Sequence, residues 1–181
     1  MKKSNLILLV GLVSIVFFSL AFQFSVRRYL KKDKKEMVGG VTSNEVRSLP
    51  YFEELVVNHG LTVFFTQDSI TTVKIQAPES YLPYITTTVT HGCLTLDQTK
   101  KSPLNDTIRV FISNPILNSL SVKTNGYFET VGPVSGDQLA LDFKKESAGK
   151  LNLSYRKIHC KKEEGAQLHL SGDSKEISFS N

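Results

Sequence analysis

Apolar and polar residues alternate with a period of two through most of the chain beyond residue 48. In "LTVFF", for example, Leu61, Val63 and Phe65 share one side and the residues between them share the other. Side chains of a β-strand point alternately to its two faces, so this pattern predicts strands with one buried face. Polar turn segments such as "TQDS" and "APES" separate the strands, and no window of a dozen residues has the period of a helix. We therefore predict an all-β domain over residues 49–181, with further inward-facing sets at Val73/Ile75/Ala77, Ile85/Thr87/Val89, Leu94/Leu96 and Ile108/Val110/Ile112.

The C-terminal half of this domain consists of short apolar–polar–apolar triplets. Strands with so few inward residues do not form stable hairpins alone, but they share a continuous core when they stack. The spacing of the triplets fits two or three short strands per turn of about 20 residues, within the range of solenoid repeats. It predicts a single-stranded β-helix or solenoid-like domain, with an irregular β-sandwich as the alternative. The triplets are Leu120/Val122, Leu139/Leu141, Leu151/Leu153, Ile158/Cys160, Leu168/Leu170 and Ile177/Phe179; Ala140, Asn152 and His169 are expected to face outward.

A continuous apolar stretch precedes this domain. Residues Asn5 to Val26 include no charged side chain in 22 positions, and a helix of that length spans a hydrocarbon core of about 30 Å. Lys2 and Lys3 flank the stretch on one side, and Arg27 and Arg28 on the other. The pattern predicts one N-terminal transmembrane helix within residues 1–30, which contacts the lipid bilayer through Leu6–Val26. A cleaved signal peptide is the alternative, because small residues lie at 19–21.

The net charge of +5 comes from the segment next to this stretch. Residues 1–40 hold eight of the 22 Lys and Arg against two acids, so residues 41–181 have 14 basic and 15 acidic residues. A nucleic-acid-binding domain needs basic residues gathered on its folded surface, and this distribution argues against one. We expect no nucleic-acid partner. Residues 31–48, which are basic and then polar without apolar periodicity, are expected to form a linker.

The topology of the chain is indicated by two opposing signals. The six Lys and Arg that follow Val26 favour the cytoplasm for the residues beyond them, since basic flanks are usually retained there. The short basic start before the apolar stretch instead resembles an export signal. We expect residues 41–181 to lie outside the cytoplasm, with the basic run held against anionic headgroups of the outer face.

Common catalytic and ligand-binding motifs are absent from the sequence. There is no Gly-rich phosphate loop, no "GxSxG", no "HExxH" and no "CxxC". His159 and His169 occupy outward positions, and they would share a face if their strands stacked, but two ligands make a weak metal site. Cys93 and Cys160 have unfavourable parities for a disulfide, with Cys160 expected in the core.

The carboxylates of the C-terminal half lie in corners beside Lys or Gly, where acids usually hydrogen-bond to their own turns. We therefore expect no enzymatic activity, no cofactor and no metal, and the sequence identifies no ligand-binding residue. These corner acids are Asp137, Asp142, Glu146, Glu163, Glu164 and Asp173.

Several segments resemble one known family. "FEELVVNHGLTVFF", the Gln67–Asp68 corner, "LPYI" at 82–85 and "GCLTL" at 92–96 are similar to the opening of the auto-transporter adhesin head GIN domain family, and "IRVFISNPILNSLSVKTNGYFET" resembles its next section. The sequence departs from the family at "KTNGYFE", which keeps only Gly126 of a small-residue corner. The resemblance implies a β-helix-like domain of unknown function, displayed on the cell envelope of Bacteroidetes-type bacteria.

These features together predict a non-catalytic, membrane-anchored envelope domain that presents a β-solenoid surface for adhesion, scaffolding or protein binding. An envelope protein or a glycan is the expected kind of partner. Two alternatives remain, which are an exported carbohydrate-active enzyme on a β-helix and a regulatory or sensory partner of a membrane complex.

Overall fold

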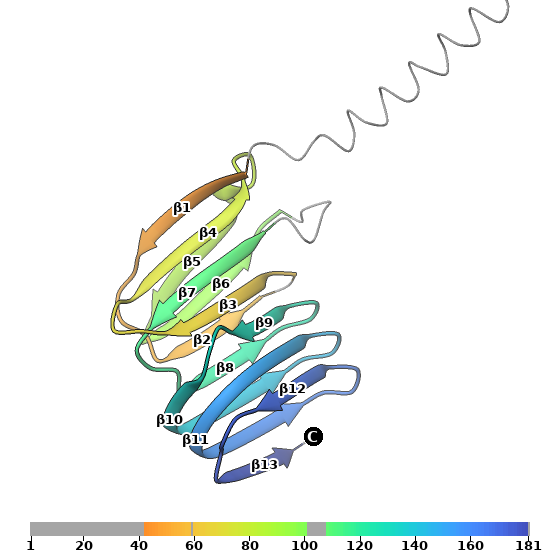
Figure 1. Ribbon diagram of the computed structural model, residues 1–181. Helices are drawn as coiled ribbons and strands as arrows, with labels where there is room; N and C mark the ends of the chain where they lie inside the picture. The colour runs from red at the N-terminus through yellow and green to blue at the C-terminus, as the bar shows by residue number, and fades with distance from the viewer. Residues whose placement is uncertain (1–41, 59, 101–107, 181) are drawn as a thin grey trace, which may run out of the picture. The chain divides into compact units, whose positions relative to one another are not determined.

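The computed structural model describes residues 42–58, 60–100 and 108–180. These residues form thirteen strands and one 3-10 helix, which confirms the predicted all-β class (Figure 1). The elements are β1 (Thr42–Ser48), β2 (Glu54–Val57), β3 (Thr62–Gln67), β4 (Thr72–Pro78), η1 (Leu82–Tyr84), β5 (Ile85–Thr90), β6 (Cys93–Gln98), β7 (Arg109–Asn114), β8 (Ser119–Val122), β9 (Tyr127–Thr130), β10 (Val134–Phe143), β11 (Ala148–Lys162), β12 (Gln167–Ser171) and β13 (Glu176–Ser180).

The strands belong to one curled, open sheet. Its path runs β1-β4-β7-β3-β9-β11-β10-β8-β2-β6-β5, and β12 and β13 both pair with the long strand β11. Among the described strands, three neighbouring pairs are antiparallel, namely β1 with β4, β4 with β7 and β5 with β6, and the other pairs are parallel. Figure 1 shows the strands as a stack that begins at β1 and ends at β13. The path therefore has two limbs, one containing β4, β7, β3, β9 and β12, and the other containing β6, β2, β8, β10 and β13.

Equivalent residues of successive strands stand above one another. Leu139 pairs with Ile158, which pairs with Ile177, so each step advances the chain by 19 residues. Because the register is kept, inward-facing side chains form columns along the stack. The inward faces of both limbs meet in one core of buried apolar residues that extends from Phe52 to Ala166.

Most of the predicted inward residues are buried. The sets on β3, β4, β6 and β7 lie in the core, as do the triplets at 120/122, 139/141, 151/153 and 158/160. Leu168 and Leu170 only pack against the edge of that core, and the prediction was wrong for the last triplet, since Ile177 is 43% and Phe179 67% exposed. These strands are less buried because no described strand pairs with the outer edge of β12 or β13.

The expected linker over residues 31–48 also needs a correction, because its last seven residues form β1. This strand pairs antiparallel with β4 along its whole length. Its half-buried side chains are Ser43, Glu45 and Arg47, so it presents polar groups to the end of the core. A strand of this kind has no apolar alternation, which explains why the sequence pattern does not reveal it.

The predicted membrane anchor, residues 1–30, lies outside the described residues. Within the part of the chain that the structure describes, no helix is long and apolar enough to cross a membrane.

Amide side chains hold the corners that join the two limbs. Asn114 is fully buried, donates from Nδ2 to the carbonyl oxygens of Phe52 (2.8 Å) and Ile116 (2.6 Å), and accepts from the hydroxyl of Thr71 (2.7 Å). Gln67 donates to the carbonyl oxygen of Ser135 (2.9 Å) and accepts from its backbone N–H (2.8 Å). Backbone groups at corners lack sheet partners, and these amides supply them.

Candidate binding surface

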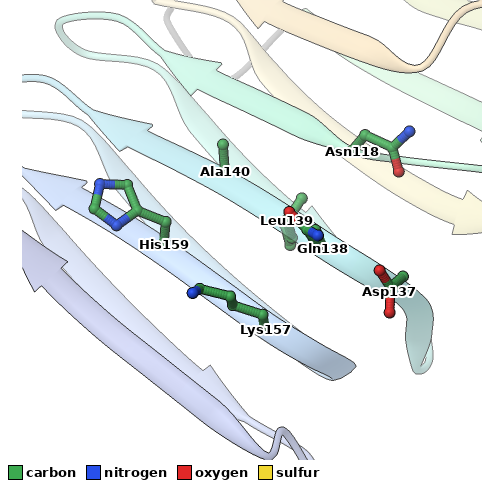
Figure 2. A pocket seen from close by; sticks show the side chains of 7 residues that line it. All are labelled: Asn118, Asp137, Gln138, Leu139, Ala140, Lys157 and His159. Carbon is green, nitrogen blue, oxygen red and sulfur yellow. The ribbon is translucent and has the colours of Figure 1, made fainter.

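A shallow groove of about 440 Å³ lies on the outward face of the limb that contains β8, β10 and β11. Figure 2 shows its side chains on neighbouring strands. The parallel register places them there, because Gln138 pairs with Lys157 and Ala140 pairs with His159. Outward positions of successive strands thus form rows on this face, as inward positions form columns in the core. The groove is lined by Asn118, Asp137, Gln138, Leu139, Ala140, Lys157 and His159.

Charges of both signs border the groove. Arg156 binds Asp137 through two hydrogen bonds, including one of 2.9 Å from the guanidinium to Oδ2, and this interaction lowers the pKa of Asp137. The ammonium group of Lys157 lies 3.5 Å from a carboxylate oxygen of Glu176 on β13. All four side chains are largely exposed, so these ion pairs contribute little to stability. Their charged atoms are therefore accessible to a ligand.

His159 is positioned by the strand that follows it in the stack. Its Nδ1 lies 3.0 Å from the hydroxyl oxygen of Ser178, and its Nε2 lies 3.4 Å from that of Ser180. The row of His159 and these hydroxyls offers hydrogen-bond donors and acceptors to a polar ligand. The arrangement suits recognition of hydroxyl or amide groups, as in a glycan or an extended peptide.

His159 and His169 do not stack on one another, so the condition for a shared face is not met. His159 pairs with Ser178 on one limb, whereas His169 pairs with Lys150 on the other. β12 pairs with the first part of β11 (148–152) and β13 with its last part (157–161), so β11 contributes to both limbs. In the described residues, no group of three or more His, Cys, Asp and Glu side chains could hold a metal ion.

The two cysteines are separate thiols, as expected. Cys160 is buried and Cys93 is half-buried, and burial raises the pKa of both thiols. A raised pKa reduces the thiolate fraction and therefore the reactivity of each group.

The corner acid Glu163 binds the neighbouring corner of the stack and not its own turn, which corrects the expectation from the sequence. Glu163 accepts a hydrogen bond from the backbone N–H of Lys145 (3.0 Å), and its other carboxylate oxygen lies 3.1 Å from the ammonium group of Lys144. The backbone bond and Lys144 together lower the pKa of Glu163. Asp142 lies 3.1 Å from the same ammonium group.

An aromatic pair on the outward face of the other limb was not expected. The rings of Phe64 on β3 and Phe111 on β7 are stacked, with their centroids 5.2 Å apart. The pair is formed because these residues are register partners in parallel strands. Alternation assigns both to the outer face, but only the strand pairing, which spans 47 residues of sequence, brings them together.

The groove residues themselves were not predicted from the sequence. Strand parity correctly places Ala140 and His159 on the outside. The neighbours across strands depend on the stacking register, which a single sequence does not fix.

Comparison with known proteins agrees with this architecture. Residues 51–181 match the family described as "Putative auto-transporter adhesin, head GIN domain". No curated protein matches the chain.

Three similar solved structures carry the description "putative adhesin". One from Parabacteroides distasonis is 19% identical, with a TM-score of 0.61, and the match covers 77% of this chain and 69% of that one. One from Bacteroides fragilis is 12% identical (TM-score 0.54; 77% and 97% covered), and one from Parabacteroides merdae is 10% identical (TM-score 0.50; 78% and 98% covered). At these identities the likeness concerns the fold. The match over residues 51–181 shows that the chain belongs to the auto-transporter adhesin head GIN domain family.

Proposed function

We propose that this protein is a non-catalytic, membrane-anchored envelope protein whose β-solenoid surface binds a partner, with adhesion or scaffolding as the result. The parallel register carries the proposal, because it repeats outward side chains at a fixed step and so builds an ordered face. Extended, regular surfaces of this kind are how stacked-repeat proteins bind their partners. The family and the solved structures described as adhesins support the same function.

The groove beside Lys157 and His159 is the proposed contact site on this surface. It combines a cation, an imidazole, amide groups and a paired carboxylate within one hollow of about 440 Å³. Such a mixture suits a neutral polar polymer better than a strongly charged one, because neither sign of charge dominates. A glycan or an extended peptide segment of another envelope protein is the proposed ligand class.

The charge states of the acids favour binding over catalysis. The lowered pKa values of Asp137 and Glu163 keep both groups ionised near neutral pH, whereas a general acid needs a raised pKa. Both carboxylates are also occupied by Arg156 and Lys144. We therefore place no catalytic role on these two acids.

Binding can be tested with the full chain displayed on cells or held in detergent micelles. A glycan array and immobilised mucin serve as probes for polysaccharide and glycoprotein ligands. Lys157→Glu combined with His159→Ala should reduce binding at least tenfold, while Lys74→Glu, an exposed charge reversal on the other limb, should leave it unchanged. Equal binding by all variants would mean that the groove is not the contact site.

The membrane arrangement is tested separately. Residues Leu6–Val26 would form the anchor, and residues 41–181 would lie beyond the outer face of the inner membrane. Asn44 is exposed on β1, so Asn44→Cys should react with a membrane-impermeant thiol reagent when the outer membrane is permeabilised and the inner one is intact. Labelling that requires lysis would instead place the domain in the cytoplasm.

A further inference from the structure

The last turn of the stack, formed by β12 and β13, has uncovered outer edges. β12 and β13 each pair with β11 on one side, and no described strand pairs with either on the other side. Along the column Leu141, Cys160 and Phe179, exposure rises from 2% and 0% to 67%, although the three residues are register partners on neighbouring strands. An uncovered parallel edge with apolar side chains is a site for further strand pairing.

A small hollow adjoins the core at this end. This hollow of about 90 Å³ opens between the two limbs and is lined by Leu153, Ile158, Leu170 and Ile177, together with small residues of the last corner. Stacked-repeat domains normally cover their ends with a polar element, because the core would otherwise meet water. Among the described residues this end has no such element.

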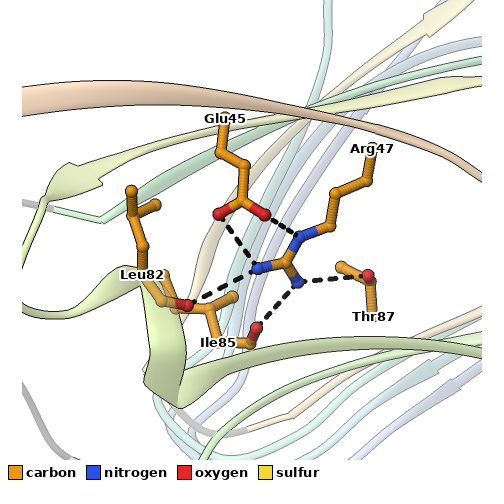
Figure 3. Close-up of polar contacts among 5 residues, drawn as sticks. All are labelled: Glu45, Arg47, Leu82, Ile85 and Thr87. Atoms are coloured by element: carbon orange, nitrogen blue, oxygen red, sulfur yellow. Dashed lines mark hydrogen bonds and ion pairs between the residues drawn. The ribbon is translucent and has the colours of Figure 1, made fainter.

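The opposite end of the stack is covered. Figure 3 shows Arg47 of β1 between Glu45 and the strand β5. Its guanidinium binds both carboxylate oxygens of Glu45 (2.9 and 3.2 Å), and it donates to the carbonyl oxygen of Ile85 (2.7 Å) and the hydroxyl of Thr87 (3.2 Å). Arg47 thus connects the two terminal strands of the sheet path. Inward-pointing charges of this kind prevent further strands from adding.

We propose that the open end binds the same end of a second copy of this chain, with β13 pairing antiparallel with the partner's β13 about a two-fold axis through Ser178. In this register Ile177 faces the partner's Phe179, and Phe179 faces the partner's Ile177. The exposed side chains of Ile177 and Phe179 would then cover one another across the two copies, since directly opposed residues in a sheet lie on the same face.

The charges of β13 are compatible with this register. Glu176 would lie opposite the partner's Ser180, so no like charges are directly opposed along Glu176–Ser180. β12 has the same property, because antiparallel pairing centred on His169 about the same axis would place Leu168 opposite the partner's Leu170. Both strands carry their apolar residues at positions symmetric about the centre, as self-pairing requires.

A second copy fits the open end better than other occupants do. A single extended peptide would cover β12 or β13 but not both edges and the core between them. The partner's own end has two edges with the same separation, so one docking event covers β12, β13 and the core between them. Head-to-tail stacking would instead bring the open end against β1 and β5, where the half-buried side chains of β1 are the polar Ser43, Glu45 and Arg47. The same surface on both copies gives a closed dimer.

Disulfide trapping of the full chain in detergent micelles tests the proposal. Ser178→Cys places a thiol at the proposed axis. Mild oxidation should convert most of the protein to a disulfide-linked dimer, and a reductant should return it to monomer under denaturing conditions. Thr88→Cys is the matched control, because Thr88 is an exposed, outward-facing residue on the edge strand β5 at the other end. It should remain monomeric under the same oxidation, as should the wild type with Cys93 and Cys160.

A second measurement does not depend on a new thiol. Light scattering corrected for detergent should show a dimer for the wild type. For Phe179→Glu the dissociation constant of the dimer should be at least tenfold larger. Phe179 is 67% exposed, so this change should leave the circular dichroism spectrum unaltered. Three results would overturn the proposal: no dimer with Ser178→Cys, a dimer that survives Phe179→Glu, or mixed oligomers when Ser178→Cys and Thr88→Cys proteins are oxidised together.

Discussion

Asn114→Ala should destabilise the domain strongly, although Asn114 does not line the groove. The side chain has no exposed surface, and its amide supplies a donor to two backbone carbonyls and an acceptor to one hydroxyl. Removing a donor leaves a buried carbonyl unpaired at a cost of about 1–3 kcal/mol. The oxygen of Phe52 is buried and receives the full cost, whereas Ile116 and Thr71 are partly exposed and regain water.

The expected loss is therefore about 2–4 kcal/mol, once the small cavity left by the amide is included. Residues 41–181, expressed without the preceding segment, provide the sample, and urea unfolding followed by circular dichroism provides the free energy of unfolding. Asn114→Leu keeps most of the volume without the hydrogen bonds, so a similar loss with this variant would assign the effect to the bonds.

Asn118→Ala is the matched control. Asn118 is exposed and donates one hydrogen bond, to a carboxylate oxygen of Glu53 (2.7 Å), so the same chemical change should alter stability by no more than about 0.5 kcal/mol. An equal, small effect at both positions would refute the view that buried amides hold the corners.

Three further predictions concern the core, the response to pH and the division of the chain. Gly149→Ala would place Cβ 2.5 Å from a ring carbon of Phe143 and should cost about 1–3 kcal/mol in urea unfolding, with partial recovery when Phe143→Leu is added. Tyr155 is buried, donates to the carbonyl oxygen of Leu117 and has a pKa raised by burial to about 12 from 10.0. The unfolded chain therefore loses this proton first, stability should fall between pH 10 and pH 12, and Tyr155→Phe should show a smaller fall over the same range. Deletion of residues 1–40 should leave a folded domain that elutes as a soluble species without detergent; a requirement for detergent would contradict the proposed boundary between anchor and domain.

The sequence pattern predicts strand identity well because each strand must bury one face. Val63, Val110 and Leu153 are assigned to the core by parity alone, and all three are buried. Parity fails where burial does not determine the strand. β1 pairs through its backbone and presents Arg47 inward, and β13 has the right alternation but no strand beyond it to cover Ile177.

The candidate site was less accessible to sequence reasoning. Lys157 and Gln138 are ordinary surface residues until the 19-residue step of the stack makes them neighbours. His159 and His169 do not share a face for the related reason that β11 contributes to both limbs. A single sequence indicates which residues face outward, but the pairing of strands far apart in the chain decides which of them meet.

The unequal sequence distances within the sheet have a consequence for the order of folding. Leu141 pairs with Leu120, and Gly149 with Phe128, each 21 residues apart, whereas Leu55 and Val63 must pair with Leu120 and Phe128, which follow them by 65 residues. Closing a longer loop costs more entropy and slows contact formation. The strands from β8 onward are therefore expected to pair first and to form the template onto which β2 and β3 dock. During synthesis the apolar faces of β2 and β3 emerge well before that template, so the period of greatest exposure to aggregation precedes the completion of the chain.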